Sequence, residues 1–157
     1  MTTTIAVAPV RKQVRVKCGP TRAFDLFACN MGRWWPKTHS LSGSPIEAVI
    51  IEPFAGGRWY ERSEDRSECA WGKVIAWEPP RRLLLNWQLN TEWEHDPELT
   101  TELEIRFTPD GEGTLVSLEH RLEGFGAAAA QMKETFEKPT AWEAIMIEFA
   151  GAADAGA

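Results

Sequence analysis

Apolar and polar residues alternate along several stretches of this chain, and alternation with a period of two indicates β-strands with one buried face. The segment Arg82–Leu89 has leucine or tryptophan at every second position. Leu99–Thr108 and Thr114–Leu122 alternate in the same way. Less regular alternation predicts further strands over Val10–Cys18, Pro45–Glu52, Arg58–Arg62 and Cys69–Trp77. The pattern therefore predicts a sheet of about seven strands.

Turn-forming residues separate the predicted strands. The polar run Ser63–Glu68 makes one turn, and the segment Glu78–Arg81 makes the next, because its two prolines have no N–H to donate to a strand ladder. Gly72 lies inside a predicted strand, where it leaves room for a neighbouring backbone or a ligand. Such short connections predict an antiparallel meander.

Helical periodicity appears in two places. Arg22–Ala28 and Asn30–Trp35 predict two short helices after the first strand. Phe125–Ala150 predicts one long C-terminal helix, in which Pro139 marks either a kink or the start of a new helix at Thr140. The apolar side of this helix holds Met132, Phe136, Trp142, Ile145, Met146 and Phe149.

This order of elements predicts an α+β fold, in which a curved antiparallel sheet holds the long C-terminal helix on its concave side. We expect a single domain over residues 10–150, with flexible tails at 1–9 and 151–157. If the helix fills the concave side incompletely, a cavity for an apolar molecule remains between helix and sheet.

Composition and sequence motifs argue against several classes of function. The net charge of −6 over 157 residues argues against a nucleic-acid partner. No apolar run is long enough to span a membrane and the N-terminus lacks the order of a signal peptide, so we expect a cytoplasmic protein. Cys18, Cys29 and Cys69 match no metal-ligand spacing, and His39 and His95 fall in predicted loops outside any ligand cluster. We expect neither a metal nor a cofactor.

Tryptophan is the unusual feature, with eight indoles against one tyrosine. Indoles bury a large area and keep one N–H for a polar partner, and methionine adapts to irregular shapes. The residues that we expect to line a ligand cavity are Trp35, Phe54, Trp59, Trp71, Trp87, Trp142 and Met146. The alternative is that they pack a solid core. Strict alternation places Trp71 on the same face as Lys73, which weakens its assignment.

Two polar residues share faces with these apolar ones. Glu61 lies two residues after Trp59, and His120 lies two residues after Leu118, so the members of each pair share a face of their strand. Both polar side chains are therefore predicted to point inward. A buried carboxylate and imidazole could pair, orient a polar group of the ligand, or act as acid and base. The alternative is that each is a structural polar residue satisfied by its neighbours.

Four segments carry a resemblance to a known family: FDLFACNMGRWWP, GGRWYE, WGKVIAWEPPRRLLLNWQ and TELEIRFTPDGEGTLVSLEH. Together they resemble the AHSA-type branch (activator of heat-shock-protein-90 ATPase homologues) of the START/birch-pollen-allergen superfamily, also called SRPBCC, over roughly residues 10–150. The resemblance implies a helix-grip fold, a seven-stranded antiparallel sheet wrapped round the C-terminal helix with a hydrophobic cavity between them. Members include lipid carriers, hormone receptors and polyketide cyclases.

The function that we expect is non-catalytic binding of a small hydrophobic or amphipathic ligand between the sheet and the C-terminal helix. One alternative, implied by the resemblance alone, is a co-chaperone-like domain with a chaperone partner and a role in the stress response. Another is a cyclase or hydratase that uses Glu61 or His120 in the cavity. Exposed edge strands and loop tryptophans leave a homodimer open.

Overall fold

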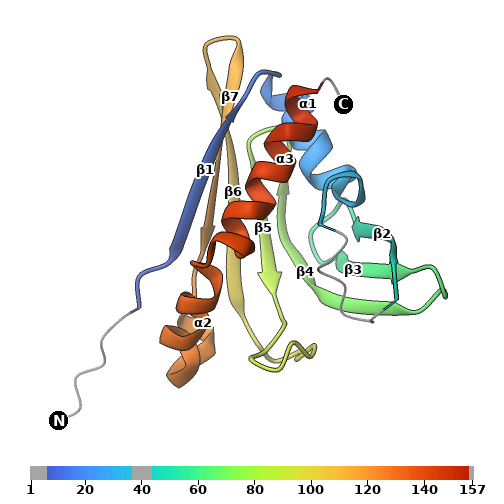
Figure 1. Ribbon diagram of the computed structural model, residues 1–157, viewed down its shortest axis with the longest axis vertical. Coiled ribbons are helices and arrows are strands. Elements are labelled where there is room, and N and C mark those ends of the chain that lie inside the picture. The colour runs from blue at the N-terminus through green and yellow to red at the C-terminus, as the bar shows by residue number, and fades with distance from the viewer. Residues whose placement is uncertain (1–6, 37–43, 156–157) are drawn as a thin grey trace.

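The computed structural model describes residues 7–36 and 44–155, and its centre is a seven-stranded antiparallel sheet in the order β1-β7-β6-β5-β4-β3-β2 (Figure 1). The strands are β1 (Val10–Val16), β2 (Ile46–Ile51), β3 (Arg58–Ser63), β4 (Glu68–Glu78), β5 (Arg82–Trp87), β6 (Thr101–Asp110) and β7 (Gly113–His120). Strands β2 to β7 pair with their neighbours in sequence, while β1 joins the far edge beside β7. This arrangement confirms the predicted meander and the helix-grip fold.

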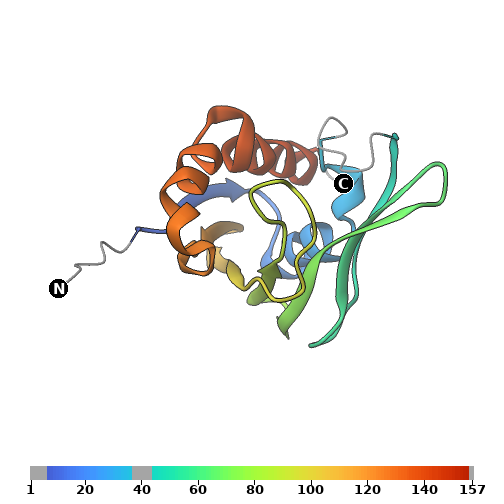
Figure 2. The ribbon, with the colours of Figure 1, turned by 90° about the horizontal axis from the view of Figure 1, so that it is seen from below.

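Helical segments occupy the concave side of this sheet (Figures 1 and 2). After β1 come α1 (Pro20–Phe24), the π-helical turn η1 (Asp25–Cys29) and the 3₁₀ turn η2 (Met31–Arg33). After β7 come the 3₁₀ segment η3 (Glu123–Ala128), α2 (Ala129–Phe136), the π-helical turn η4 (Pro139–Glu143) and α3 (Ala144–Asp154). In Figure 1, α3 crosses the face of the sheet diagonally.

The C-terminal helix is divided, unlike the single helix predicted. Lys138 is extended, with φ −62° and ψ 145°, so η4 begins anew at Pro139, one residue before the start at Thr140 that the sequence offered as an alternative. Ala141, with φ −95° and ψ −128°, breaks the helix a second time.

Helix α3 also extends beyond Ala150, where the sequence placed its end. It continues to Asp154, within the segment expected to be a tail. Ala153 is buried, and the Asp154 carboxylate accepts a hydrogen bond of 2.9 Å from the backbone N–H of Lys17. This hydrogen bond therefore joins the C-terminal end of α3 to the chain just after β1.

A β-bulge explains how Trp71 reaches the interior. Trp59 pairs with Gly72 while Tyr60 pairs with Ala70, so Trp71 is the extra residue of β4 opposite β3. Trp71 is buried although Lys73, with which strict alternation pairs it, is exposed. The bulge breaks the alternation that placed these two side chains on one face.

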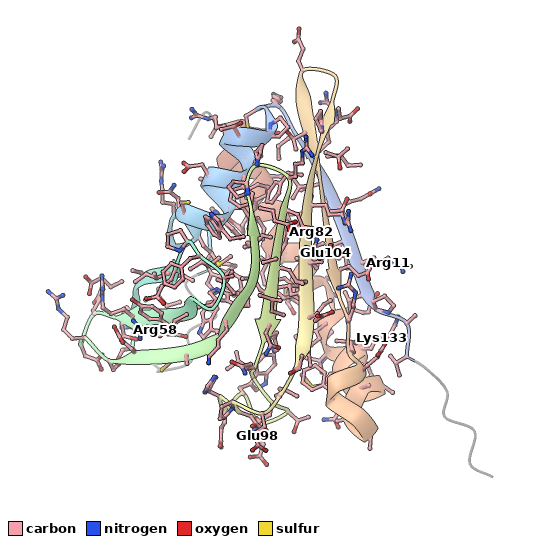
Figure 3. All side chains as sticks on the ribbon, turned by 180° about the vertical axis from the view of Figure 1, so that it is seen from behind. Arg11, Arg58, Arg82, Glu98, Glu104 and Lys133 are labelled. Carbon is pink, nitrogen blue, oxygen red and sulfur yellow. The ribbon has the colours of Figure 1, made fainter. Side chains whose placement is uncertain are left out.

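The convex face of the sheet carries charged side chains instead of helices (Figure 3). Glu104 on β6 is only 4% exposed, and three arginines surround its carboxylate. Arg121 lies 2.5 Å from it, Arg106 lies 3.0 Å from it, and Arg82 donates a short hydrogen bond. Burial by itself raises the pKa of the Glu104 carboxyl, but the hydrogen bonds from Arg82 and Arg121 and the charge of Arg106 hold this pKa below its ordinary value.

Candidate functional site

A pocket of about 630 Å³ lies between the sheet and the C-terminal helical segments. Strands β4 and β5 form one wall, η4 and the start of α3 form the opposite wall, and the β5–β6 connection borders the opening. The lining residues are Trp35, Trp71, Trp87, Leu89, Glu92, Trp93, Glu94, Thr135, Phe136, Lys138, Thr140, Ala141, Trp142 and Ile145. The concave side is thus incompletely filled by side chains.

Five of the residues that line this pocket are tryptophans. Trp35 and Trp71 lie with their ring centroids 4.7 Å apart, and Trp87 and Trp142 lie 5.5 Å apart across the space between sheet and η4. Trp35 and Trp142 approach to 6.3 Å at near-perpendicular planes. These tilted and edge-to-face contacts restrict the movement of the large rings, so the walls present aromatic surfaces.

Polar side chains gather at the opening. Glu92 and Glu94 come from the β5–β6 connection, while Lys138 and Thr140 flank the start of η4. All four are exposed, whereas Trp71, Trp87 and Trp142 are buried. The pocket is therefore apolar within and charged at its rim.

The β5–β6 connection has an ordered turn beside this opening (Figure 2). The side-chain oxygen of Asn90 accepts hydrogen bonds from the backbone N–H of Glu92 (2.9 Å) and of Glu94 (3.0 Å). Trp93 adopts a left-handed conformation with φ 61°, and its half-exposed indole packs against Trp87 and Phe136. The turn holds one indole at the mouth of the pocket.

The N–H groups of three lining indoles are bonded within the protein. Trp71 donates to the Glu61 carboxylate at 3.0 Å, and Trp142 donates to Nδ1 of His120 at 3.2 Å. Trp87 donates to the backbone carbonyl of Leu89 at 3.1 Å. These bonds leave the rings, and not their N–H groups, as the surface offered to a ligand.

Glu61 and His120 are fully buried, as expected, but they lie behind the pocket walls and not on them. The other hydrogen bond of His120 runs from Nε2 to the hydroxyl oxygen of Thr101 at 3.1 Å, so the imidazole does not pair with Glu61. Burial lowers the pKa of His120 to about 3, because an apolar surrounding disfavours the charged form. The imidazole is neutral at ordinary pH.

The structure separates the cavity candidates into three groups. Trp35, Trp71, Trp87 and Trp142 lie along the pocket. Trp59 and Met146 are buried without lining it, Trp59 packing 5.4 Å from Trp71. Phe54 is 54% exposed, so its placement in the cavity was wrong. It belongs to a tight turn after β2, in which the N–H of Gly57 bonds to the Phe54 carbonyl, and this turn directs the ring outward.

Several lining residues were missed. Phe136 and Ile145 carried a signal, since they belong to the apolar side of the predicted helix. Trp93, Glu92 and Glu94 lie in the β5–β6 connection, which has no hydrophobic periodicity. The only signal for these residues is that a connection between two strands lies at an end of the sheet. Among the described residues, no three His, Cys, Asp or Glu side chains gather as metal ligands would, and His39 lies outside those residues.

Residues 21–152 match the family described as "Activator of Hsp90 ATPase homolog 1-like protein". The chain belongs to this family. The match confirms the family predicted from sequence and covers every element from α1 to most of α3. No curated protein matches the chain. Within residues 7–36 and 44–155, this AHSA1-like protein has no helix with the length and apolar character of a membrane span.

Solved structures similar to this AHSA1-like protein include proteins of different named roles. The anthrahydroquino-gamma-pyrone synthase Txn09 is 32% identical, with 93% of this chain and 97% of that chain covered at a TM-score of 0.64. The self-sacrificing resistance protein CalC from Micromonospora echinospora is 27% identical, with coverage of 95% and 96% and a TM-score of 0.73. The Aha1 dimer from Colwellia psychrerythraea, at 12% identity, coverage of 96% and 98% and a TM-score of 0.62, shares the fold.

Proposed function

We propose that this protein binds a small apolar or amphipathic molecule in the pocket between the sheet and the C-terminal helical segments. The observation that carries the proposal is a pocket of about 630 Å³ with indole walls and a charged rim. Ligand sites in proteins are typically clefts of about 300–1,000 Å³, apolar inside with a few polar groups. An apolar body would lie against Trp71, Trp87 and Trp142, and a polar end would face the rim.

The names of two similar proteins support this proposal. One similar protein is called a synthase of a pyrone-containing compound and another is called a resistance protein. Both names suit proteins that handle small molecules, and both chains are covered almost completely. Fold similarity alone is a weak warrant for function, so the pocket geometry remains the main argument.

Calorimetric titration with 1-anilinonaphthalene-8-sulfonate, which joins flat rings to an anionic end, tests the proposal. Ile145→Trp places a larger side chain at the pocket wall, while Ile147→Trp makes the same change on the exposed side of α3, where Ile147 is 60% exposed. We expect Ile145→Trp to weaken binding about tenfold or more and Ile147→Trp to leave it unchanged. Equal affinities in the two variants, both folded by circular dichroism, would reject the pocket as the site.

Native mass spectrometry of the purified protein identifies a natural ligand directly. A stoichiometric mass that disappears on denaturing extraction would name the compound class. A clean protein mass together with no heat of binding for the probe would count against the proposal.

A second candidate is an enzyme of the cyclase or hydratase type, favoured by 32% identity with a synthase over nearly the whole chain. Glu61 and His120 would then act through the indoles that they hold, because neither lines the pocket. Unchanged mass, chromatographic retention and fragmentation of a bound natural ligand after prolonged incubation would dispose of this candidate, because ring closure can leave the mass alone unaltered. The family name also suggests a chaperone partner, for which stimulation of a heat-shock-protein-90 ATPase in a mixing assay is the test. A cytoplasmic location and a homodimer stay predictions.

A further inference from the structure

A directional chain of hydrogen bonds runs behind the pocket. The indole N–H of Trp142 can only donate, so Nδ1 of His120, at 3.2 Å, is unprotonated and accepts. The neutral imidazole therefore carries its proton on Nε2 and donates it to the Thr101 hydroxyl oxygen at 3.1 Å. The Thr101 hydroxyl donates in turn to the backbone carbonyl of Trp87 at 2.7 Å. Each polar hydrogen in this series has an acceptor.

The imidazole of His120 lies against three residues that line the pocket. Its ring centroid is 4.7 Å from that of Phe136, 5.5 Å from that of Trp87 and 5.9 Å from that of Trp142. His120 itself is fully buried and does not line the pocket. It is placed to act on a ligand only through the side chains that it contacts.

The bond to Trp142 also crosses between two layers of the fold. His120 ends β7, whereas Trp142 belongs to η4, directly after the backbone break at Ala141. Because the helix is interrupted there, regular backbone hydrogen bonding does not by itself fix how Trp142 is turned. The acceptor on the sheet adds a directional constraint on the N–H to the ring contacts that Trp142 makes with Trp35, Trp87 and Phe136.

We infer that His120 sets the ligand specificity of the pocket, as a positioning residue that turns the N–H of Trp142 away from the ligand. The inference rests on the proposed binding function. The N–H groups of Trp71 and Trp87 also donate to acceptors within the protein. The inner pocket therefore offers the aromatic faces of these three indoles but none of their N–H donors. A ligand with a hydrogen-bond acceptor beside these three rings would lose water there and gain no donor from them. The inner end of the preferred ligand is therefore hydrocarbon.

Fluorene and fluoren-9-one form a matched pair of probes, because they share one ring frame and differ by a single carbonyl acceptor. In equilibrium dialysis, we expect the wild-type protein to favour fluorene. His120→Phe removes the acceptor and releases the N–H of Trp142, so the preference should move toward fluorenone by about 2- to 10-fold, the worth of one hydrogen bond. His120→Asn keeps an oxygen near the place of Nδ1 and should restore the wild-type ratio.

The reciprocal variant keeps the inference testable if His120→Phe does not fold. Trp142→Phe removes the donor together with the five-membered ring that covers Nδ1 of His120, so this acceptor becomes accessible from the pocket. The donor-bearing 9-fluorenol should then gain about 2- to 10-fold over fluorene, relative to the wild-type ratio. Unchanged ratios in the folded variants would overturn the inference.

A readout that needs no ligand separates this inference from the proposed function. The ¹⁵N–¹H resonance of the Trp142 indole should exchange slowly with solvent in the wild-type protein and in His120→Asn, and faster in His120→Phe. Equal exchange in the three proteins would show that His120 does not position Trp142, whether or not a ligand binds. Protected exchange with no binding of either probe to the wild-type protein would reject the proposed function for flat hydrocarbons, and the specificity role with it.

Discussion

Gly72 is a glycine because a neighbouring backbone leaves no room for a side chain. A side chain at this position would begin 1.8 Å from the carbonyl oxygen of Asn86 on β5, which no rotamer can relieve. The sequence left open whether the space served a backbone or a ligand. The close approach of β4 and β5 decides for the backbone, and Gly72 is absent from the pocket lining.

Gly72→Ala should therefore lower the free energy of unfolding by about 3 kcal/mol or more, through steric strain between two paired strands. Gly151→Ala is the matched control, because nothing lies within 4 Å of a side chain added at that helical position. The control should raise stability by about 0.5–1 kcal/mol. Urea unfolding of the three proteins measures both effects, and a nearly neutral Gly72→Ala would contradict the close approach of β4 and β5 at this position.

At the scale of elements, Glu104 joins three strands on the convex face. Its carboxylate on β6 meets Arg82 on β5 as well as Arg106 on its own strand, and Arg121 follows β7 directly (Figure 3). A buried carboxylate is tolerated only where partners compensate for its lost hydration. Removing the charge would leave three arginines without their shared partner.

Glu104→Gln should cost about 3 kcal/mol of stability, as expected when one member of a buried ionic group is removed. Asp110→Asn breaks an exposed pair with Arg15, whose side chains are 51% and 52% exposed, and should cost less than about 1 kcal/mol. Thermal unfolding at low and high salt distinguishes the two, since only the exposed pair is screened strongly. Equal small losses in the two variants would show that the network adds little.

Elements were predictable where a period extends over many residues. The strands and the helical faces followed from alternation, and the fold class followed from their order. Trp71 and Phe54 were harder, because a bulge and a tight turn each reverse the direction of a side chain without changing the composition. The break at Ala141 and the left-handed Trp93 depend on tertiary contacts, which local patterns do not contain.

At the scale of the whole molecule, the fold buries a titratable group at the meeting point of its layers. This group is His120, which is fully buried, and burial disfavours its charged form. The unfolded chain binds a proton at this site near pH 6.5, whereas burial lowers the pKa of His120 in the folded state to about 3. Stability from this group is therefore fully present above pH 6.5 and is lost as the pH falls toward 3.

Comparison of the wild-type protein with His120→Asn isolates this effect, because asparagine does not titrate. The free energy of unfolding of the wild-type protein should fall relative to that of the variant by about 1.4 kcal/mol per pH unit between pH 6 and pH 4. Chemical denaturation at a series of pH values provides the measurement. Parallel pH profiles would mean that the imidazole becomes protonated in the folded state without penalty.

The crowding of indoles around the pocket also has an optical consequence. Trp35, Trp71, Trp87 and Trp142 lie within a few ångströms of one another, and Trp93 touches the same group at the mouth. Excitation absorbed by one ring passes readily to the next at such separations, so the cluster emits as a coupled unit. An aromatic molecule that binds there and absorbs at the wavelengths of tryptophan emission, as 1-anilinonaphthalene-8-sulfonate does, would accept energy from the whole set, and intrinsic emission would report occupancy of the unlabelled protein.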